Sequence, residues 1–157
     1  MSTNFPIHKL LLIDDDDDDC FIFRTIVHEI SSTFEVKTID SCKTAMDIIR
    51  SYRPELIFLD INLPIIAGHT FLQELKESTI AHLPVVMYST SDYPKDIERA
   101  YQLGASLYFR KVAGLQAFRD SLTEILSMEW HAPESIRMQH YSDGVYRPYS
   151  LSNDVAG

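Results

Sequence analysis

The feature that most constrains the fold of this chain is a regular alternation of short apolar runs with amphipathic segments. The apolar runs occupy residues 8–13, 34–39, 55–60, 84–89 and 106–111. Segments with helical spacing follow them at about 18–30, 44–52, 69–78, 91–104 and 115–126. Strands that alternate with helices over short connections form βαβ crossovers. The pattern therefore predicts an α/β fold, a mainly parallel sheet with helices on both faces.

Helix boundaries are marked by proline and glycine. Pro54 follows the second helical segment and should end it, since proline cannot continue a helix. Asp92, Tyr93 and Pro94 resemble the start of the fourth helix, and Gly104 is placed as its C-terminal cap.

Composition sets the class of molecule. The chain has 157 residues, 45% hydrophobic and 24% charged, which fits one globular domain with a real core. No apolar run approaches the length that crosses a bilayer. The two cysteines, Cys20 and Cys42, show no metal-binding or disulfide spacing, so we expect a reducing, cytoplasmic location. A formal net charge of −9 argues against nucleic acid as a partner and suits cations or basic protein surfaces.

The C-terminal part differs from the rest. We place the main domain at residues 1–128 and a C-terminal extension, not a separate domain, at 129–157. The extension contains Pro, Gly and no sustained periodicity, which is typical of a floppy tail. It also carries Trp130, Tyr141, Tyr146 and Tyr149, more aromatic residues than a disordered segment usually has. The second interpretation is therefore a segment packed against the domain or a neighbour.

Polar residues follow four of the five predicted strands. They are Asp14, Asp15, Asp60, Ser89, Thr90 and Lys111. Ligands of open parallel sheets bind at the carboxyl ends of the strands, so these side chains should converge at one edge.

The converging groups suit phosphoryl transfer. Three close carboxylates cannot all stay ionised without a cation, and oxygen ligands favour Mg²⁺. An aspartate can also act as a nucleophile toward phosphorus. Lys111 and the Ser89 hydroxyl could then neutralise the phosphoryl oxygens, which is most of what such a transfer requires.

Four segments resemble the receiver domain of bacterial two-component response regulators, in a stand-alone, chemotaxis-regulator-like form. They are LLLIDD (10–15), LIFLDINLPIIAG (56–68), PVVMYSTS (84–91) and GASLYFRK (104–111). The resemblance covers roughly residues 8 to 127. It implies a flavodoxin-like, doubly wound sheet of five parallel strands in the order 2-1-3-4-5 with five helices, followed here by the C-terminal extension.

The resemblance also implies roles for single residues. Asp60 matches the phosphoacceptor. Asp14 and Asp15 would bind Mg²⁺ together with Asp60, and Asn62 would offer its backbone carbonyl to the metal. Of the six consecutive aspartates, the resemblance thus makes the first two metal ligands. The run 16–17 would lie in a loop, and 17–19 would cap the following helix.

The remaining matches concern the switch and the loops. Ser89 matches the switch hydroxyl, with Thr90 as its rival. Lys111 matches the lysine that contacts the phosphoryl group, and Tyr108 the aromatic residue whose rotamer reports activation. The loop residues that shape the turn into the third helix are matched by Pro64 and Gly68.

Two positions depart from the family pattern. Ala67 stands where an acidic or small polar residue usually precedes the glycine, and we expect little consequence. Val112 follows Lys111 where the family usually has proline, often with a cis bond. A cis bond before a non-proline residue costs about 3 kcal/mol. The reach of Lys111 therefore depends on whether this peptide is trans.

Each assignment has a simpler alternative. Asp60 could cap a loop, and Asp14 and Asp15 could cap the first helix. Ser89 could be a turn hydroxyl and Lys111 a solvated lysine. Tyr108 could be ordinary core packing.

We expect a signalling switch rather than an enzyme. A sensor histidine kinase or histidine phosphotransfer protein would phosphorylate Asp60, and the switched surface would bind an unknown downstream protein, or a second copy as a homodimer. We hypothesise that the extension docks near the fifth helix and modulates this surface. The alternative is a receiver-like interaction module that works without phosphate. A flavoprotein or dehalogenase-like phosphatase fits less well, because aspartates fill the first loop and Asn62 stands where a phosphatase needs a second acid.

Overall fold

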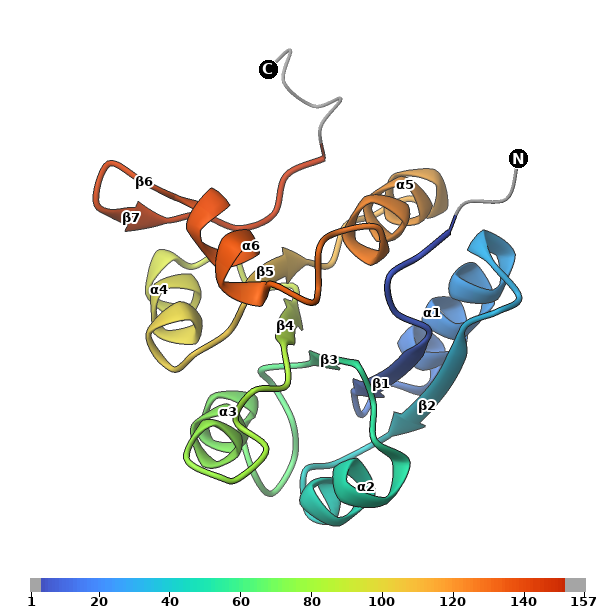
Figure 1. Cartoon of the computed structure of the whole chain (residues 1–157), viewed down its shortest axis with the longest axis horizontal. Helices are drawn as coiled ribbons and strands as arrows, with labels where there is room; N and C mark the ends of the chain where they lie inside the picture. The colour runs from blue at the N-terminus through green and yellow to red at the C-terminus, as the bar shows by residue number, and fades with distance from the viewer. Residues whose placement is uncertain (1–3, 152–157) are drawn as a thin grey trace.

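The structure, a computed structural model, describes residues 4–151 and has a single five-stranded sheet at its centre (Figure 1). The strands are β1 (Lys9–Ile13), β2 (Glu35–Ile39), β3 (Leu56–Leu59), β4 (Val85–Ser89) and β5 (Leu107–Arg110). The helices between and after them are α1 (Asp17–Ile30), α2 (Ala45–Tyr52), α3 (Gly68–Lys76), α4 (Pro94–Gln102) and α5 (Leu115–Leu126).

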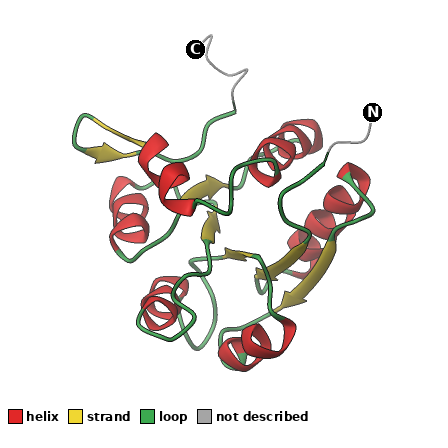
Figure 2. Ribbon diagram, viewed as in Figure 1, coloured by secondary structure: helices red, strands yellow, loops and turns green. Residues whose placement is uncertain are grey.

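The strand order is β2-β1-β3-β4-β5, and every neighbouring pair is parallel. This confirms the predicted doubly wound, flavodoxin-like fold. Helices lie on both faces of the sheet, as the ribbon in Figure 2 shows. Strands β3 and β4 are buried at every residue, and β1 is buried from Leu10 onward, because helices cover them on both sides.

The alternation of side chains along the strands creates two cores. Leu10 and Leu12 point to the face that packs against α1 and α5, where Phe23 and Leu122 are buried. Leu11 and Ile13 point to the opposite face, where the buried side chains come from α2, α3 and α4. Strand β1 therefore serves both cores, which is why it is apolar at every position from Leu10 to Ile13.

Helix ends follow local signals. Helix α4 begins at Pro94, its first residue, and its last hydrogen-bonded turn is followed by Gly104 at φ 110°. This conformation is available to glycine without strain, as the sequence predicted. In α1 the N-cap is Asp16, whose side chain accepts the N–H of Asp19. The prediction that Asp16 is only a loop residue is thus wrong.

The C-terminal extension is structured over residues 129–151. It contains a sixth helix, α6 (Pro133–Gln139), and an antiparallel hairpin of β6 (Tyr141–Ser142) and β7 (Val145–Tyr146). Trp130, Ile136 and Tyr149 are buried and join the core beside α5. The floppy-tail interpretation is therefore wrong for this part of the extension, and packing against the domain is correct. Residues 152–157 lie outside the described residues.

Candidate functional site

Three carboxylates meet at the carboxyl edge of the sheet, as the sequence predicts. Asp14 directly follows β1 and Asp60 directly follows β3, and both are buried, whereas Asp15 is exposed. One oxygen from each of the three lies within 4.8 Å of the others. Adjacent parallel strands end side by side here, so their following residues are brought together by the topology. This donor set of oxygens, two of them shielded from water, fits a hard divalent cation.

Lys111 enters the same cleft from the end of β5. Its Nζ lies 2.7 Å from Asp14 Oδ2, 2.9 Å from Asp19 Oδ2 and 3.5 Å from Asp60 Oδ2. No described peptide bond is cis, so the Lys111–Val112 bond is trans. The missing proline does not prevent the ammonium from reaching the acids.

Burial and charge shift the pKa values of this cluster. Burial raises the pKa of Asp60, and the nearby Lys111 charge and the Asn62 N–H offset only part of the effect. For Lys111, burial alone would lower the pKa. Its hydrogen bonds to Asp14 and Asp19 and the charge of Asp60 more than compensate, so the net pKa is raised. The ammonium therefore stays charged, which is what a phosphoryl-binding group requires.

The loop after Asp60 is held close to the site. The backbone N–H of Asn62 donates to Asp60 Oδ1 at 3.2 Å. Gly68, the first residue of α3, packs closely against this segment. A Cβ at Gly68 would lie only 2.1 Å from the Asp60 carbonyl oxygen. Glycine is therefore needed here for close approach of two backbones. The geometry places Asn62 beside the acceptor, while the role of its carbonyl stays a prediction.

The two candidate switch hydroxyls differ in environment. Ser89 is the last residue of β4 and is fully buried, while its neighbour Thr90 is exposed. The Ser89 hydroxyl accepts the N–H of Ser91 at 3.2 Å. Ser89 is thus enclosed at the end of β4, and the choice between it and Thr90 as the switch hydroxyl stays a prediction.

Tyr108 is buried in β5, with its ring turned inward. Its hydroxyl donates to the Ser91 carbonyl at 3.0 Å. Burial raises the pKa of its phenol, while hydrogen bonds with Ser89 and Ser91 act in the opposite direction. The side chain is therefore connected to the loop that follows Ser89. Because any buried tyrosine hydroxyl needs such a partner, the switch role of Tyr108 stays a prediction.

Two contributors to the site were missed at the sequence level. Asp19, predicted to serve only as a helix cap, is the second partner of Lys111. The Lys111 ammonium lies over the ring of Tyr88, with its Nζ 4.8 Å from the ring centroid. A signal existed for Asp19: it lies in the first turn of α1, only four residues after Asp15, and so stays near the strand-end edge. Nothing in the sequence distinguishes Tyr88 from other strand tyrosines.

A doubly wound sheet with acids and a lysine at its carboxyl edge defines the receiver class of signalling domains. The chain matches the response regulator receiver domain family over residues 10–123 and belongs to that family, whose members act in two-component signalling. Among curated relatives, the response regulator protein GraR of Staphylococcus aureus is 28% identical over 129 residues. That match covers 77% of this chain and 55% of GraR, so the chain spans about half the length of the curated relatives it matches.

Solved structures show the same fold. The phosphorylated cyanobacterial phytochrome response regulator RcpA is 31% identical, with a TM-score of 0.69 over 76% of this chain and 91% of RcpA. The Mn²⁺-bound form of the response regulator Rcp1 is 25% identical, with a TM-score of 0.67 over 75% of this chain and 91% of Rcp1. The chemotaxis response regulator CheY4 of Vibrio cholerae shares the fold at 20% identity, with a TM-score of 0.66 over 76% of this chain and 99% of CheY4. No helix within residues 4–151 is long and apolar enough to span a membrane.

Proposed function

We propose that this receiver accepts a phosphoryl group on Asp60 and thereby switches a protein-binding surface in two-component signalling. The observation that carries the proposal is the position of Asp60, buried between the carboxylates of Asp14 and Asp15 and the ammonium of Lys111. An Asp60 oxygen forms a bond to phosphorus while the bond between phosphorus and the donor breaks. The donor is a phosphohistidine of a sensor histidine kinase or of a histidine phosphotransfer protein.

Mg²⁺ fits the carboxylate cluster, and when bound it would neutralise a phosphoryl oxygen. Asp14, Asp15 and Asp60 would hold it, with the backbone carbonyl of Asn62 as a further ligand. Lys111 would move from Asp14 toward the phosphoryl group, since the cation replaces its charge at Asp14. Similarity to RcpA, whose structure is of the phosphorylated form, and to Rcp1, whose structure is of the Mn²⁺-bound form, supports this proposal.

The hydroxyl side of the site would complete the acceptor. Ser89, rather than the exposed Thr90, would donate to the phosphoryl group, and Tyr108 would keep its inward position. The change would reach the surface of α4, β5 and α5, where a downstream protein or a second copy would bind. We place this activity in the cytoplasm and class it as a switch, not as an enzyme acting on other substrates.

The test is phosphorylation by acetyl phosphate with Mg²⁺, followed by intact-mass measurement. We expect one added phosphoryl group in the wild type, none in Asp60→Ala, and little or none in Asp15→Ala. Asp16→Ala is the matched control: it removes an adjacent carboxylate outside the cluster and should still be labelled. If the wild type gains no mass from acetyl phosphate or from any histidine kinase, the phosphorylation-independent interaction module is the better description.

A further inference from the structure

The outer edge of β5 is an interaction surface occupied by the chain itself. Because β5 is the last strand of the sheet, its outer backbone groups have no strand partner. Tyr149 donates its N–H to the Tyr108 carbonyl at 2.7 Å. The hydroxyl of Tyr101 accepts the Tyr108 N–H at 3.0 Å and donates to the Arg147 carbonyl at 2.8 Å. Residues 145–151, which we name the strap, thus bond the Tyr108 carbonyl directly. They also accept from the Tyr101 hydroxyl, which itself bonds the Tyr108 N–H.

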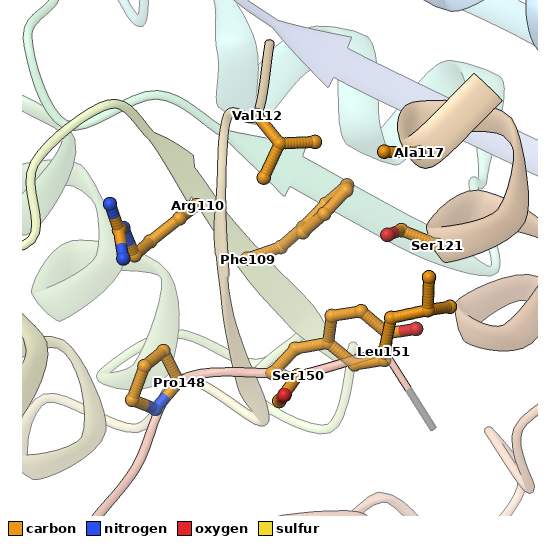
Figure 3. A pocket seen from close by; sticks show the side chains of 9 residues that line it. Phe109, Arg110, Val112, Ala117, Ser121, Pro148, Ser150 and Leu151 are labelled. Atoms are coloured by element: carbon orange, nitrogen blue, oxygen red, sulfur yellow. The ribbon is translucent and has the colours of Figure 1, made fainter. Parts of the chain in front are cut away.

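Side chains fix the strap to the neighbouring helices. The ring of Tyr146 stacks on Tyr101 of α4, with centroids 4.7 Å apart. At the other end, the buried Tyr149 packs edge-on against Phe109 and donates its hydroxyl to Glu124 of α5 at 2.6 Å. A cavity of about 300 Å³ remains between β5, α5 and the end of the strap, and Figure 3 shows the side chains that line it. The strap therefore bridges α4 and α5 across β5.

The residue held by the strap is also connected to the phosphoryl-transfer site. The hydroxyl of Tyr108 donates to the Ser91 carbonyl, and the N–H of Ser91 donates to the Ser89 hydroxyl. The strap thus bonds the backbone of Tyr108, and the side-chain hydroxyl of the same residue bonds the backbone of Ser91, next to Ser89. Contacts of this kind carry coupling when the element they share has two arrangements. The structure shows Tyr108 inward, and an outward position is the second arrangement that the proposed switch implies.

We propose that the strap is an internal ligand of the β5 edge that holds Tyr108 inward and so favours phosphorylation of Asp60. This inference rests on the proposed function, in which the phosphorylated state also favours inward Tyr108. Two ligands that favour one state stabilise each other reciprocally, so phosphorylation should in turn tighten the strap. A downstream protein that binds this edge would have to displace the strap.

The first test compares two isosteric variants of the full chain. Tyr101→Phe removes the hydroxyl that links Tyr108 to Arg147. Tyr146→Phe is the matched control, because its ring stacks on Tyr101 while the described contacts include no hydrogen bond from its hydroxyl to Tyr108. At a fixed acetyl phosphate and Mg²⁺ concentration, we expect the phosphorylated fraction of Tyr101→Phe to fall roughly three- to tenfold, the effect of about one hydrogen bond. Equal fractions in both variants would overturn the coupling.

The second test measures hydrogen exchange and does not require phosphorylation. Without a donor, Tyr149→Ala should speed amide exchange in residues 89–92 and 107–110. Val145→Ala, which changes an exposed residue of the strap, should leave the exchange of these residues unchanged. With acetyl phosphate and Mg²⁺, exchange in the strap should slow in the wild type and not in Asp60→Ala. A wild type that is never labelled defeats the proposed function, and the exchange of residues 89–92 then still decides the coupling. Unchanged exchange there in Tyr149→Ala rejects it.

Discussion

At the scale of single residues, Asp60 combines burial with a charge that its neighbours only partly compensate. Burial raises its pKa more than Lys111 and the Asn62 N–H lower it. The fold stabilises the ionised form of such a carboxylate poorly when no cation is bound. A divalent ion or a phosphoryl group that binds in this state therefore gains the most free energy. The ionised form of Asp60, the proposed phosphoacceptor, therefore costs the metal-free protein some stability.

The pH dependence of this expense can be predicted. A carboxyl group whose folded-state pKa is raised stabilises the fold below its unfolded pKa, and that contribution is lost as the pH rises through the folded value. In chelator, Asp60→Asn should therefore melt at a higher temperature than the wild type at neutral pH, and the difference should shrink as Asp60 becomes protonated in acid.

Thermal unfolding monitored by circular dichroism across this pH range measures the effect. The exposed Asp40, changed to Asn, is the control for loss of one acidic charge. A lower melting temperature for Asp60→Asn at neutral pH would show that the charge pair with Lys111 outweighs burial.

At the scale of elements, the six aspartates divide between a site and a helix start. Asp14 and Asp15 belong to the carboxylate cluster, Asp16 caps α1, and Asp19 returns to the cleft as a partner of Lys111. Acidic groups in the first turn also face the positive end of the helix dipole. One acidic run can therefore supply both the site and the helix cap, because only three residues separate the end of β1 from the start of α1.

Loss of the α1 cap has a predictable effect. Asp16→Ala removes the acceptor of the Asp19 N–H and should lower the free energy of unfolding by about 1 kcal/mol. For a chain of this size that corresponds to roughly 2–4 °C in melting temperature.

Asp17→Ala offers the matched control, since Asp17 is exposed and is itself the first residue of α1, next to the cap. Melting curves of the two variants at equal ionic strength provide the comparison. A similar decrease in both would indicate that general charge, rather than the cap, stabilises the helix start.

At the scale of the whole molecule, the extension closes the sheet on its open side. Helix α6 lies between α4 and α5 near β5 in Figure 1, and Arg137 of α6 donates to the Ala105 carbonyl at 2.8 Å. The extension joins the core at its root, where the buried Trp130 donates its indole N–H to the Ile125 carbonyl at 2.7 Å. The described extension thus packs against the domain through buried side chains.

A spectroscopic prediction follows from the root of the extension. Trp130 is the single tryptophan of the chain and is buried, so its emission should be blue-shifted in the native protein. If extension and core form one cooperative unit, the fluorescence and far-ultraviolet dichroism transitions in urea should coincide. A fluorescence transition at lower urea would show that the extension detaches before the core unfolds.

The fold and most of the site could be predicted because both depend on local signals. Apolar runs alternating with amphipathic segments define βαβ units, and the polar residues at strand ends are brought to one edge by any parallel sheet. The predicted strand order and resemblance are confirmed. The roles of Asp16 and Asp19 could not be predicted. Which acid caps the helix and which pairs with Lys111 depends on side-chain directions within one turn.

The hairpin and the helix of the extension were not predicted from the sequence. Asp143 and Gly144 have positive φ and form the tight turn between β6 and β7, and Asp-Gly is a known hairpin signal that the short, weakly patterned flanks concealed. Likewise, Pro133 is the first residue of α6, a usual position for proline at a helix start. These elements are too short to be stable alone, so their sequence pattern is weak.

The sequence by itself determined the strand–helix alternation, the parallel sheet and the identity of the acids and the lysine at its carboxyl edge. Periodicity and strand ends are encoded within a few neighbouring residues, so they can be read without coordinates. Only the tertiary structure decided that Asp19 shares Lys111 with Asp14, and that the strap occupies the edge of β5 and holds Tyr108. Those contacts join residues about 40 to 100 positions apart, and they arise from packing of whole elements, which no local pattern records.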